Sequence, residues 1–354
     1  MSFFACIFDT MNIFTTKLLA WYALHKRDLP WRHTIDPYTV WLSEVIMQQT
    51  RVTQGLPYYV RFVSQYPKVN DLANASEDEL LKLWQGLGYY SRARNLHKTA
   101  KEVVQLHGGV FPSTYNELIT LPGIGPYTAS AIASICFDEV TAVVDGNVYR
   151  VLARYFDEDS PINQPKGVRL FKKLAQSLID PQNPGTYNQA IMEFGALQCA
   201  PKRPLCSSCP LERNCQSRAN NTIAQRPQKI KSKAVRNRFF HYLIPIDINQ
   251  NTVLNKRDEK DIWRGLYEFP LLEADRILTE KKLRSHPDIP IWAMNVKWTK
   301  FEDEVMIHKL SHQTLHAHFW ILEGIKKQLP TPWAEVQNFG VPRLIDRFLQ
   351  KFNR

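Results

Sequence analysis

Apolar residues recur every three or four positions through the first two thirds of the chain, which is the spacing of one buried helix face. Local signals mark helix ends: Ser76 and Glu79 have the spacing of a capping box, and Gly108-Gly109 is typical of a helix end. We expect the first helix to start at Met11, after a frayed extension over residues 1–10. The same spacing predicts further helices over residues 37–50, 76–88, 92–109, 114–121, 167–179 and 186–199.

The pattern changes in the last third of the chain, where β-branched and aromatic residues partly alternate with polar ones. This texture predicts strands, and a final helical pattern over 341–352 closes the chain. We therefore expect a mainly helical first domain and a smaller α+β second domain. The predicted strands cover residues 237–248, 251–257, 265–272 and 314–324.

A strongly basic segment separates the two patterns. Residues 226–238 contain six basic side chains and no acidic one. Such a segment fits a linker that follows a phosphate backbone, and it fits a merely solvated connector equally well. We divide the chain into a domain over 11–225, this linker, and a domain over 239–354.

Charge and length narrow the class of protein. A chain of 354 residues is long enough for two cores, and its formal net charge of +11 favours a polyanionic partner such as nucleic acid. A basic enzyme of another kind remains open on charge alone. The apolar stretch at 128–137 is about half as long as a membrane span, so we expect no membrane association.

The cysteines gather in one short region with the spacing Cys-x6-Cys-x2-Cys-x5-Cys. This crowding indicates a metal site in a reducing compartment rather than a disulfide framework. An irregular ladder within one loop suits a [4Fe–4S] cluster better than zinc, which usually takes two Cys-x2-Cys pairs, although zinc and free or disulfide-bonded cysteines stay open. The four cysteines are Cys199, Cys206, Cys209 and Cys215.

The stretch "LPGIGPYTASA" predicts a tight turn before a helix that begins near Pro126. Pro122 can start such a turn, and Gly123 and Gly125 can adopt positive φ. Backbone amides beside the helix N-terminus would then suit an anion, and for a basic protein that anion is a DNA phosphate. A plain connection between two helices is the alternative.

Two carboxylates stand among apolar neighbours. Asp145 interrupts the run "AVVDGNVYRV", where it is either a used carboxylate, the N-cap of the next helix, or both. Glu44 projects from the largely apolar helix "VWLSEVIMQQT". Desolvation would raise the pKa of a glutamate there, which suits a general acid, whereas a solvated helix position is the alternative.

With these motifs in their order along the sequence, the chain resembles the A/G-specific adenine DNA glycosylases, the MutY family of the helix–hairpin–helix superfamily. The resemblance covers nearly the whole chain. It implies a mainly α helix–hairpin–helix glycosylase domain with a [4Fe–4S] cluster loop over 199–215, followed by an α+β Nudix-like domain. The motifs that match are "DLPWR", "WLSEVIMQQT", "GLGYYSRARNLH", "LPGIGPYTA", "VDGNVYRVLAR", "NQAIMEFGALQC", the cysteine ladder and "IWRGLYEFP".

The resemblance implies hydrolysis of adenine mispaired with 8-oxoguanine or guanine in double-stranded DNA, after the nucleotide is flipped out. Glu44 is implied to protonate adenine, and Asp145 to stabilise the cationic sugar. Tyr127 and Asn147 are implied to orient both carboxyls. Tyr127 also stands where bifunctional relatives have a lysine, and a phenol forms no Schiff base, so we expect base release without strand cleavage.

The remaining positions are likewise assigned by resemblance. Helical spacing would favour Gln48, rather than Gln49, as the side chain one turn from Glu44, but the motif assigns Gln49. The implied sets are the phosphate-binding hairpin Gly123 and Gly125; the duplex wedges Gln49 and Tyr89; the adenine pocket Arg27, Trp31, Arg32 and Gln189; and the 8-oxoguanine contacts Thr50, Leu87, Ser311 and His312.

The second domain departs from the Nudix hydrolases in one respect. The acidic helix that binds Mg²⁺ in those enzymes is absent after "EFP", where "LLEADRILTEKKLRSH" stands instead, so we expect a binding module. The family's Phe-Ser-His loop is Leu310-Ser311-His312 here. Rival interpretations are a bifunctional glycosylase/lyase, a damage-binding protein without chemistry and a zinc-containing scaffold. We expect a monomer in the bacterial cytoplasm, at the nucleoid.

Overall fold

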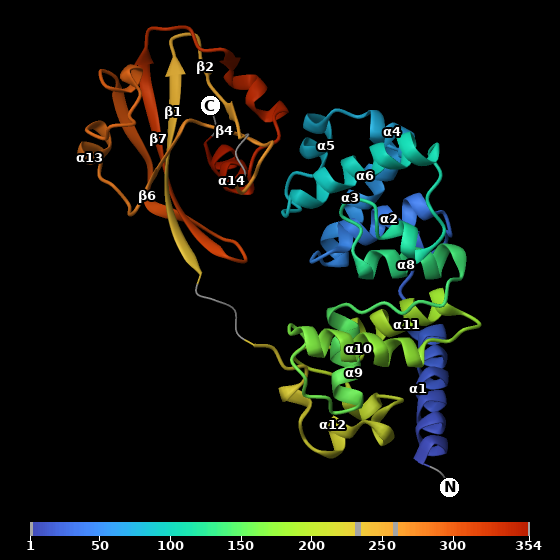
Figure 1. Cartoon of the computed structure of the whole chain (residues 1–354). Coiled ribbons are helices and arrows are strands. Elements are labelled where there is room, and N and C mark those ends of the chain that lie inside the picture. The colour runs from blue at the N-terminus through green and yellow to red at the C-terminus, as the bar shows by residue number, and fades with distance from the viewer. Residues whose placement is uncertain (1–2, 231–234, 258–260, 353–354) are drawn as a thin grey trace. The chain divides into compact units, whose positions relative to one another are not determined.

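The computed structural model describes residues 3–230, 235–257 and 261–352. Its contacts divide the chain into two compact units. The first comprises Met1–Asn74 and Lys98–Lys231, and the second comprises Ala75–His97 and Ser232–Arg354. A short helical segment of the N-terminal region is therefore grouped with the C-terminal domain, and each unit is described by itself below (Figure 1).

The first unit is built from helices, which confirms the helical pattern. The first helix begins at Phe3 rather than Met11, and several predicted helices end two or three residues earlier than expected. Its α-helices are α1 (Phe3–His25), α2 (Pro37–Met47), α3 (Val52–Gln65), α4 (Val69–Asn74), the end of α6 (Ser91–His107), α7 (Tyr115–Leu118), α8 (Pro126–Phe137), α9 (Gly146–Tyr155), α10 (Pro165–Leu178), α11 (Pro184–Leu197) and α12 (Gln216–Ala219), with 3-10 turns η1 (Pro30–Arg32), η2 (Cys206–Ser208), η3 (Glu212–Asn214) and η4 (Ile223–Gln225).

One core of this unit gathers α1, α9, α10 and α11, which lie together in Figure 1. Phe14 and Leu18 of α1 are fully buried there beside Phe171 of α10. A glycine sets the closest approach: a Cβ on Gly195 of α11 would lie 2.7 Å from Cβ of Asn147 on α9. The N-terminus of α9, which bears Asn147, is thus pressed directly against α11.

The second unit contains a four-stranded sheet in the order β5-β1-β7-β6, in which β1 runs parallel to β7 and the other neighbours are antiparallel. Phe348 of the last helix stacks on Phe319 of β7 with ring centroids 4.4 Å apart, so this helix covers one face of the sheet. The elements are α5 (Glu77–Leu83), the start of α6, β1 (Arg236–Asp247), β2 (Asn251–Thr252), β3 (Asn255–Lys256), β4 (Tyr267–Glu268), β5 (Leu271–Ala274), α13 (Glu280–Arg284), η5 (Ile291–Ala293), β6 (Lys297–Lys309), β7 (Gln313–Ile325), β8 (Thr331–Pro332), η6 (Trp333–Asn338) and α14 (Arg343–Lys351).

Strand β6 is absent from the sequence-based prediction. Its alternation is hidden by the acidic run that begins at Glu302, and its register against β7 shifts between Phe301 and Met306. The strand forms because Trp298 and Met306 are buried on the sheet. The α+β fold class itself is confirmed.

The basic segment 226–238 is not a uniform linker. Arg226 forms an ion pair with Asp157 at 2.9 Å, and β1 already begins at Arg236. Arg238 is buried within that strand. Residues 231–234 lie outside the described part of the chain. No helix in the described ranges is long and apolar enough to cross a lipid bilayer.

Candidate functional site

Glu44 and Tyr127 meet across the first unit. Glu44 lies on α2 and Tyr127 at the start of α8, and the Tyr127 hydroxyl donates to Oε2 of Glu44 at 2.6 Å. The same hydroxyl lies 3.0 Å from the sulfur of Met192 on α11. Burial raises the pKa of Glu44 to about 7, the Tyr127 hydrogen bond opposes this shift, and the charge of Asp145 adds to it. A carboxyl that keeps its proton near neutral pH can donate it to a bound group.

Asp145 is the N-cap of α9. Its carboxylate accepts hydrogen bonds from the amides of Asn147 and Val148, each at 2.8 Å, and from Nδ2 of Asn147, also at 2.8 Å. Capping favours the charged form, yet burial raises the pKa of Asp145 and outweighs these hydrogen bonds. The prediction that Asp145 is the N-cap of α9 is confirmed.

Arg150 links the Asp145 cap to the cysteine loop, and sequence reasoning missed it. Its Nη2 donates to Oδ1 of Asn147 at 2.8 Å and its Nε to the carbonyl of Cys199 at 2.7 Å. Asn147 is thereby held on both sides, by Asp145 and by Arg150. The available signal was spacing, because Arg150 follows Asn147 by three residues on one helix.

A second ion-pair cluster surrounds Glu193, which was also missed. Glu193 is 1% exposed and accepts bidentate hydrogen bonds from both Arg27 and Arg32, with the shortest at 2.5 Å. Burial raises the pKa of Glu193, but the two arginines outweigh it and hold the pKa at about 2. Sequence could have identified Glu193 in the same way as Glu44, because it is an acidic residue within the mostly apolar helix α11.

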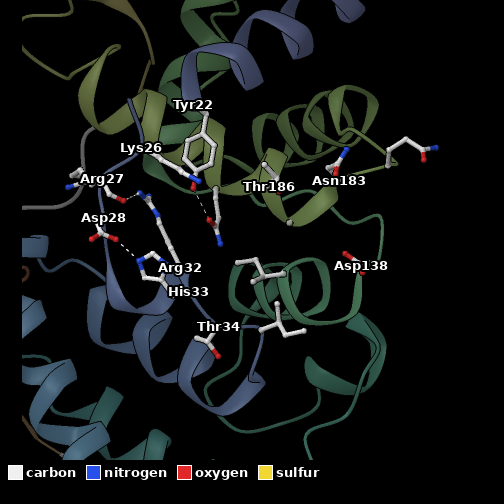
Figure 2. A pocket seen from close by; sticks show the side chains of 15 residues that line it. Tyr22, Lys26, Arg27, Asp28, Arg32, His33, Thr34, Asp138, Asn183 and Thr186 are labelled. Carbon is white, nitrogen blue, oxygen red and sulfur yellow. Dashed lines mark hydrogen bonds and ion pairs between the residues drawn. The ribbon is translucent and has the colours of Figure 1, made fainter. Parts of the chain in front are cut away.

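Three of the four predicted adenine-pocket residues line one cavity of about 410 Å³, between the end of α1, the end of α8 and the start of α11 (Figure 2). Arg27 and Arg32 form one wall, and the Tyr22 hydroxyl donates to Oε1 of Gln189 at 2.8 Å. Trp31 does not line this cavity. It packs edge-on against Tyr59 of α3, with centroids 5.1 Å apart.

The glycine turn differs in part from expectation. Gly123 has φ +73°, as predicted, whereas Gly125 has φ −90° and is the extended N-cap of α8. Only one glycine therefore needs the left-handed conformation. Without a side chain, Gly125 offers no hydrogen bond to the first amides of α8, and the Thr99 hydroxyl holds the carbonyl of Pro122 on the preceding side.

The predicted wedge on α2 lies just beyond the helix. α2 ends at Met47, so helical spacing does not extend to Gln48, whose amide instead donates to the Thr128 hydroxyl at 3.2 Å. Gln49 is exposed with φ +54°, and Thr50 follows it. Helical spacing favours Gln48 and the motif favours Gln49, but the spacing argument does not apply to either residue because α2 ends at Met47.

The four clustered cysteines share one cavity wall. Cys199, Cys206, Cys209 and Cys215 are half-buried free thiols lining a single small cavity, and an Arg154 nitrogen lies 3.4 Å from the sulfur of Cys199. Four soft sulfur donors around one space fit a metal–sulfur group. Within the described residues, no three cysteine, histidine or acidic side chains are arranged to hold a single metal ion.

The second unit carries the remaining candidates. Leu87, Tyr89, Ser311 and His312 line a cavity of about 580 Å³ that the 308–313 loop shares with residues 261–263. The hydroxyls of Tyr89 and Ser311 are 2.7 Å apart, and Tyr89 has φ +48°. The turn Leu310–Gln313 is closed by the Leu310 amide, which donates to the Gln313 carbonyl at 2.8 Å. The other predicted wedge and lesion contacts, Gln49 and Thr50, belong to the first unit.

Comparison with known proteins gives a consistent result. The model of the HhH-GPD superfamily of base excision DNA repair proteins matches residues 42–177, and a NUDIX domain model matches residues 241–351. An adenine DNA glycosylase of Buchnera aphidicola subsp. Baizongia pistaciae is 34% identical, with 98% of each chain covered. The adenine DNA glycosylase of Homo sapiens is 47% identical over 59% of this chain and 40% of its own.

Two solved structures of DNA repair enzymes are also similar to part of this chain. A thermostable thymine-DNA glycosylase has a TM-score of 0.56 at 29% identity, covering 60% of this chain and 98% of its own. An endonuclease III structure in complex with DNA has a TM-score of 0.52, covering 63% and 99%. At 22% identity it shows the common fold alone.

The contact between Tyr127 and Glu44 generates a direct prediction. In Tyr127→Phe the hydroxyl that favours the ionised carboxylate is lost, so the pKa of Glu44 should rise above its value of about 7. Carboxyl chemical shifts of ¹³C-labelled glutamate, followed against pH, measure this. Met192→Leu leaves the hydroxyl in place and serves as the control. An unchanged or lowered pKa in Tyr127→Phe would contradict the assigned hydrogen bond.

Proposed function

The chain belongs to the family of adenine DNA glycosylases, DNA N-glycosylases of base excision repair, and on that premise we propose that it removes adenine paired with 8-oxoguanine or guanine and leaves the DNA strand intact. The observation that supports this most directly is the pair of half-buried carboxyls with different hydrogen-bond partners. Glu44 keeps a proton near neutral pH, and Asp145 accepts three hydrogen bonds that favour its charged form.

These two groups suit the two halves of N-glycosidic bond cleavage. Adenine must first leave the base stack to reach the protein interior. Glu44 then donates its proton to the N7 atom of the flipped base, so that the electron pair of the glycosidic bond leaves with adenine. The sugar becomes an oxocarbenium-like cation, which the Asp145 carboxylate stabilises until water adds to C1′.

The surrounding residues hold these groups in place. Tyr127 orients Glu44 through its hydroxyl, and Asn147 orients Asp145 through its amide. The cavity of Figure 2 places Arg27, Arg32 and Gln189 together, where they would receive the flipped base; Trp31 joins this set by resemblance only. The charge of the Arg32 guanidinium also lowers the pKa of Glu44, but neither Glu44 nor Asp145 lines this cavity.

The phosphate of the flipped nucleotide would bind at the Gly123–Gly125 turn. The uncapped start of α8 offers backbone amides and the positive end of the helix dipole. The chain's positive net charge supports binding to double-stranded DNA in general. We further place the enzyme, as a monomer, at the nucleoid in the bacterial cytoplasm.

The decisive experiment uses duplexes with one adenine opposite 8-oxoguanine, guanine or thymine. Abasic sites should form opposite 8-oxoguanine and guanine, and strand breaks should appear only after alkali. Borohydride should trap no covalent adduct, because the phenol of Tyr127 cannot form an imine. Breaks that appear without alkali as fast as base release would indicate a lyase, and intact adenine in every duplex would refute the proposed activity.

Glu44→Gln tests the assigned acid. It should bind the mispaired duplex but excise adenine about 10²- to 10⁴-fold more slowly. Because Glu44 acts in its protonated form, the wild-type rate should fall as the pH rises through about 7, and this limb should vanish in the variant. Single-turnover kinetics at several pH values measure both effects, with Glu102→Gln, a helix-surface glutamate, as the control. Near-normal excision by Glu44→Gln would remove Glu44 from this role.

We assign the cysteine loop to a [4Fe–4S] cluster. Cys199, Cys206, Cys209 and Cys215 would hold it through their thiolates, and its role there would be structural or electronic rather than catalytic. The loop also contains Lys202 and Arg203, so fixing it fixes a basic surface.

Metal analysis tests the cluster. Anaerobically purified protein should contain about four irons and four acid-labile sulfides per chain. Cys206→Ser should lose iron, whereas Cys136→Ser, a free cysteine of α8 outside the cavity, should keep it. Stoichiometric zinc in a colourless, active preparation would overturn the assignment.

The cavity of the second unit would read the 8-oxoguanine partner. The Ser311 hydroxyl can accept the N7–H that 8-oxoguanine has and guanine lacks, and it can do so while its own hydrogen is donated to the Tyr89 hydroxyl. Leu310 gives an apolar contact without ring stacking. Thr50 and Leu87 complete the implied contacts, and Gln49 and Tyr89 would enter the duplex as wedges.

A double variant tests this assignment. Ser311→Ala with His312→Ala should lose about 1–3 kcal/mol of transition-state stabilisation opposite 8-oxoguanine and much less opposite guanine. Excision rates on both duplexes measure the difference. The matched control is Ser285→Ala with His286→Ala, a second Ser-His pair of the same unit. An equal loss on both duplexes, or none, would mean that the loop does not distinguish the lesion.

A further inference from the structure

Arg238, the last basic residue of the segment expected to be a linker, is an internal residue of β1. Its side chain is 8% exposed, and each of its five N–H bonds has an acceptor. Two pairs of hydrogen bonds, at 2.6–2.8 Å, run to the carboxylates of Asp261 and Glu273. The fifth runs to Oε1 of Gln313 at 3.4 Å. A guanidinium saturated in this way has no hydrogen left for a phosphate.

Two of these acceptors, Asp261 and Gln313, lie on opposite walls of the cavity that contains Ser311, whereas Glu273 does not line it. Asp261 begins the wall formed by residues 261–263, and Gln313 ends the turn that bears Ser311. The backbone adds to this link, because the Arg236 amide of the same strand donates to the carbonyl of His312 at 3.1 Å. The start of β1 therefore holds the two walls at a fixed separation.

The wall at 261–263 is held in a strained conformation. Trp263 has φ +64°, a left-handed conformation that a bulky residue rarely adopts. Arg257 supports it by donating to Asp261 at 2.9 Å and to the Ile262 carbonyl at 3.0 Å. The Trp263 ring then stands edge-on to His308, another residue of the cavity, at 5.8 Å.

We propose that Arg238 is a positioning residue for partner-base discrimination: it joins Asp261 to the Ser311 turn and keeps Trp263 in its left-handed conformation as a wall of the recognition cavity. The proposal rests on the proposed function, since the cavity must read the base opposite adenine. Arg238 touches no DNA in this assignment. It acts through the distance between the two walls.

The test compares Arg238→Gln with Arg276→Gln, an arginine of the same unit whose side chain is 68% exposed. Single-turnover adenine excision is measured opposite 8-oxoguanine and opposite guanine, well below the melting temperature of each variant. Arg238→Gln should lower the ratio of the two rates by about tenfold, the effect of one or two lost hydrogen bonds to the lesion, while Arg276→Gln leaves the ratio unchanged. Asp261→Asn keeps the side-chain shape but weakens the contacts of Asp261 with Arg238 and Arg257, so it should also lower the ratio. This variant replaces Arg238→Gln in the test if Arg238→Gln does not fold.

The outcomes separate this inference from the proposed function. If Arg238 has only a structural role, both rates fall together with the active fraction and the ratio is preserved, which would overturn the inference. If Ser311→Ala with His312→Ala lowers the ratio but Arg238→Gln and Asp261→Asn do not, the cavity reads the lesion without Arg238. A wild-type protein with no preference between the two partners would instead refute the proposed reading of 8-oxoguanine.

Discussion

The partial burial of two carboxyls is the constraint on which the candidate site depends. Burial raises the pKa of both Glu44 and Asp145. Because burying a carboxyl costs free energy unless it is hydrogen-bonded, each of the two side chains needs specific hydrogen-bond partners. The partners differ: Glu44 receives one hydroxyl, whereas Asp145 receives two backbone amides and one side-chain amide. Burial is the largest cause of both shifts, and the three donors at the start of α9 oppose it at Asp145 by favouring the charged form of that carboxyl.

The fold could be predicted from the sequence where structure is local. The capping box of Ser76 and Glu79 forms as its spacing indicates, and Asp145 is the N-cap of α9 as its position suggested. Glu44 was recognisable because a carboxylate on an apolar helix face conflicts with its surroundings. The family and the fold class were recognisable because the motifs occur in order along nearly the whole chain.

The features that sequence reasoning missed depend on contacts between distant segments. Glu193 and its two arginines are brought together from α11 and the loop after α1, and no local pattern couples them. Arg238 was assigned to a linker because its neighbours in sequence are basic, whereas its partners Asp261 and Glu273 follow much later. Strand β6 was missed for a related reason, since it depends on burial against β7 and not on a clear alternation of its own.

The parallel pairing of β1 with β7 has a consequence for how the chain is made. Arg236 is paired with Gln313, and every further parallel partner of β1 follows Gln313 in the sequence. During synthesis, β1 leaves the ribosome long before β7, the strand with which it pairs in parallel. Until β7 has been made, the apolar residues Leu243 and Ile244 of β1 lack their native packing. The antiparallel neighbour β5 appears earlier and can shield only one edge. The second unit is therefore completed only when the C-terminal strand and helix have left the ribosome, and a chain truncated before β7 would expose an unpaired, aggregation-prone strand.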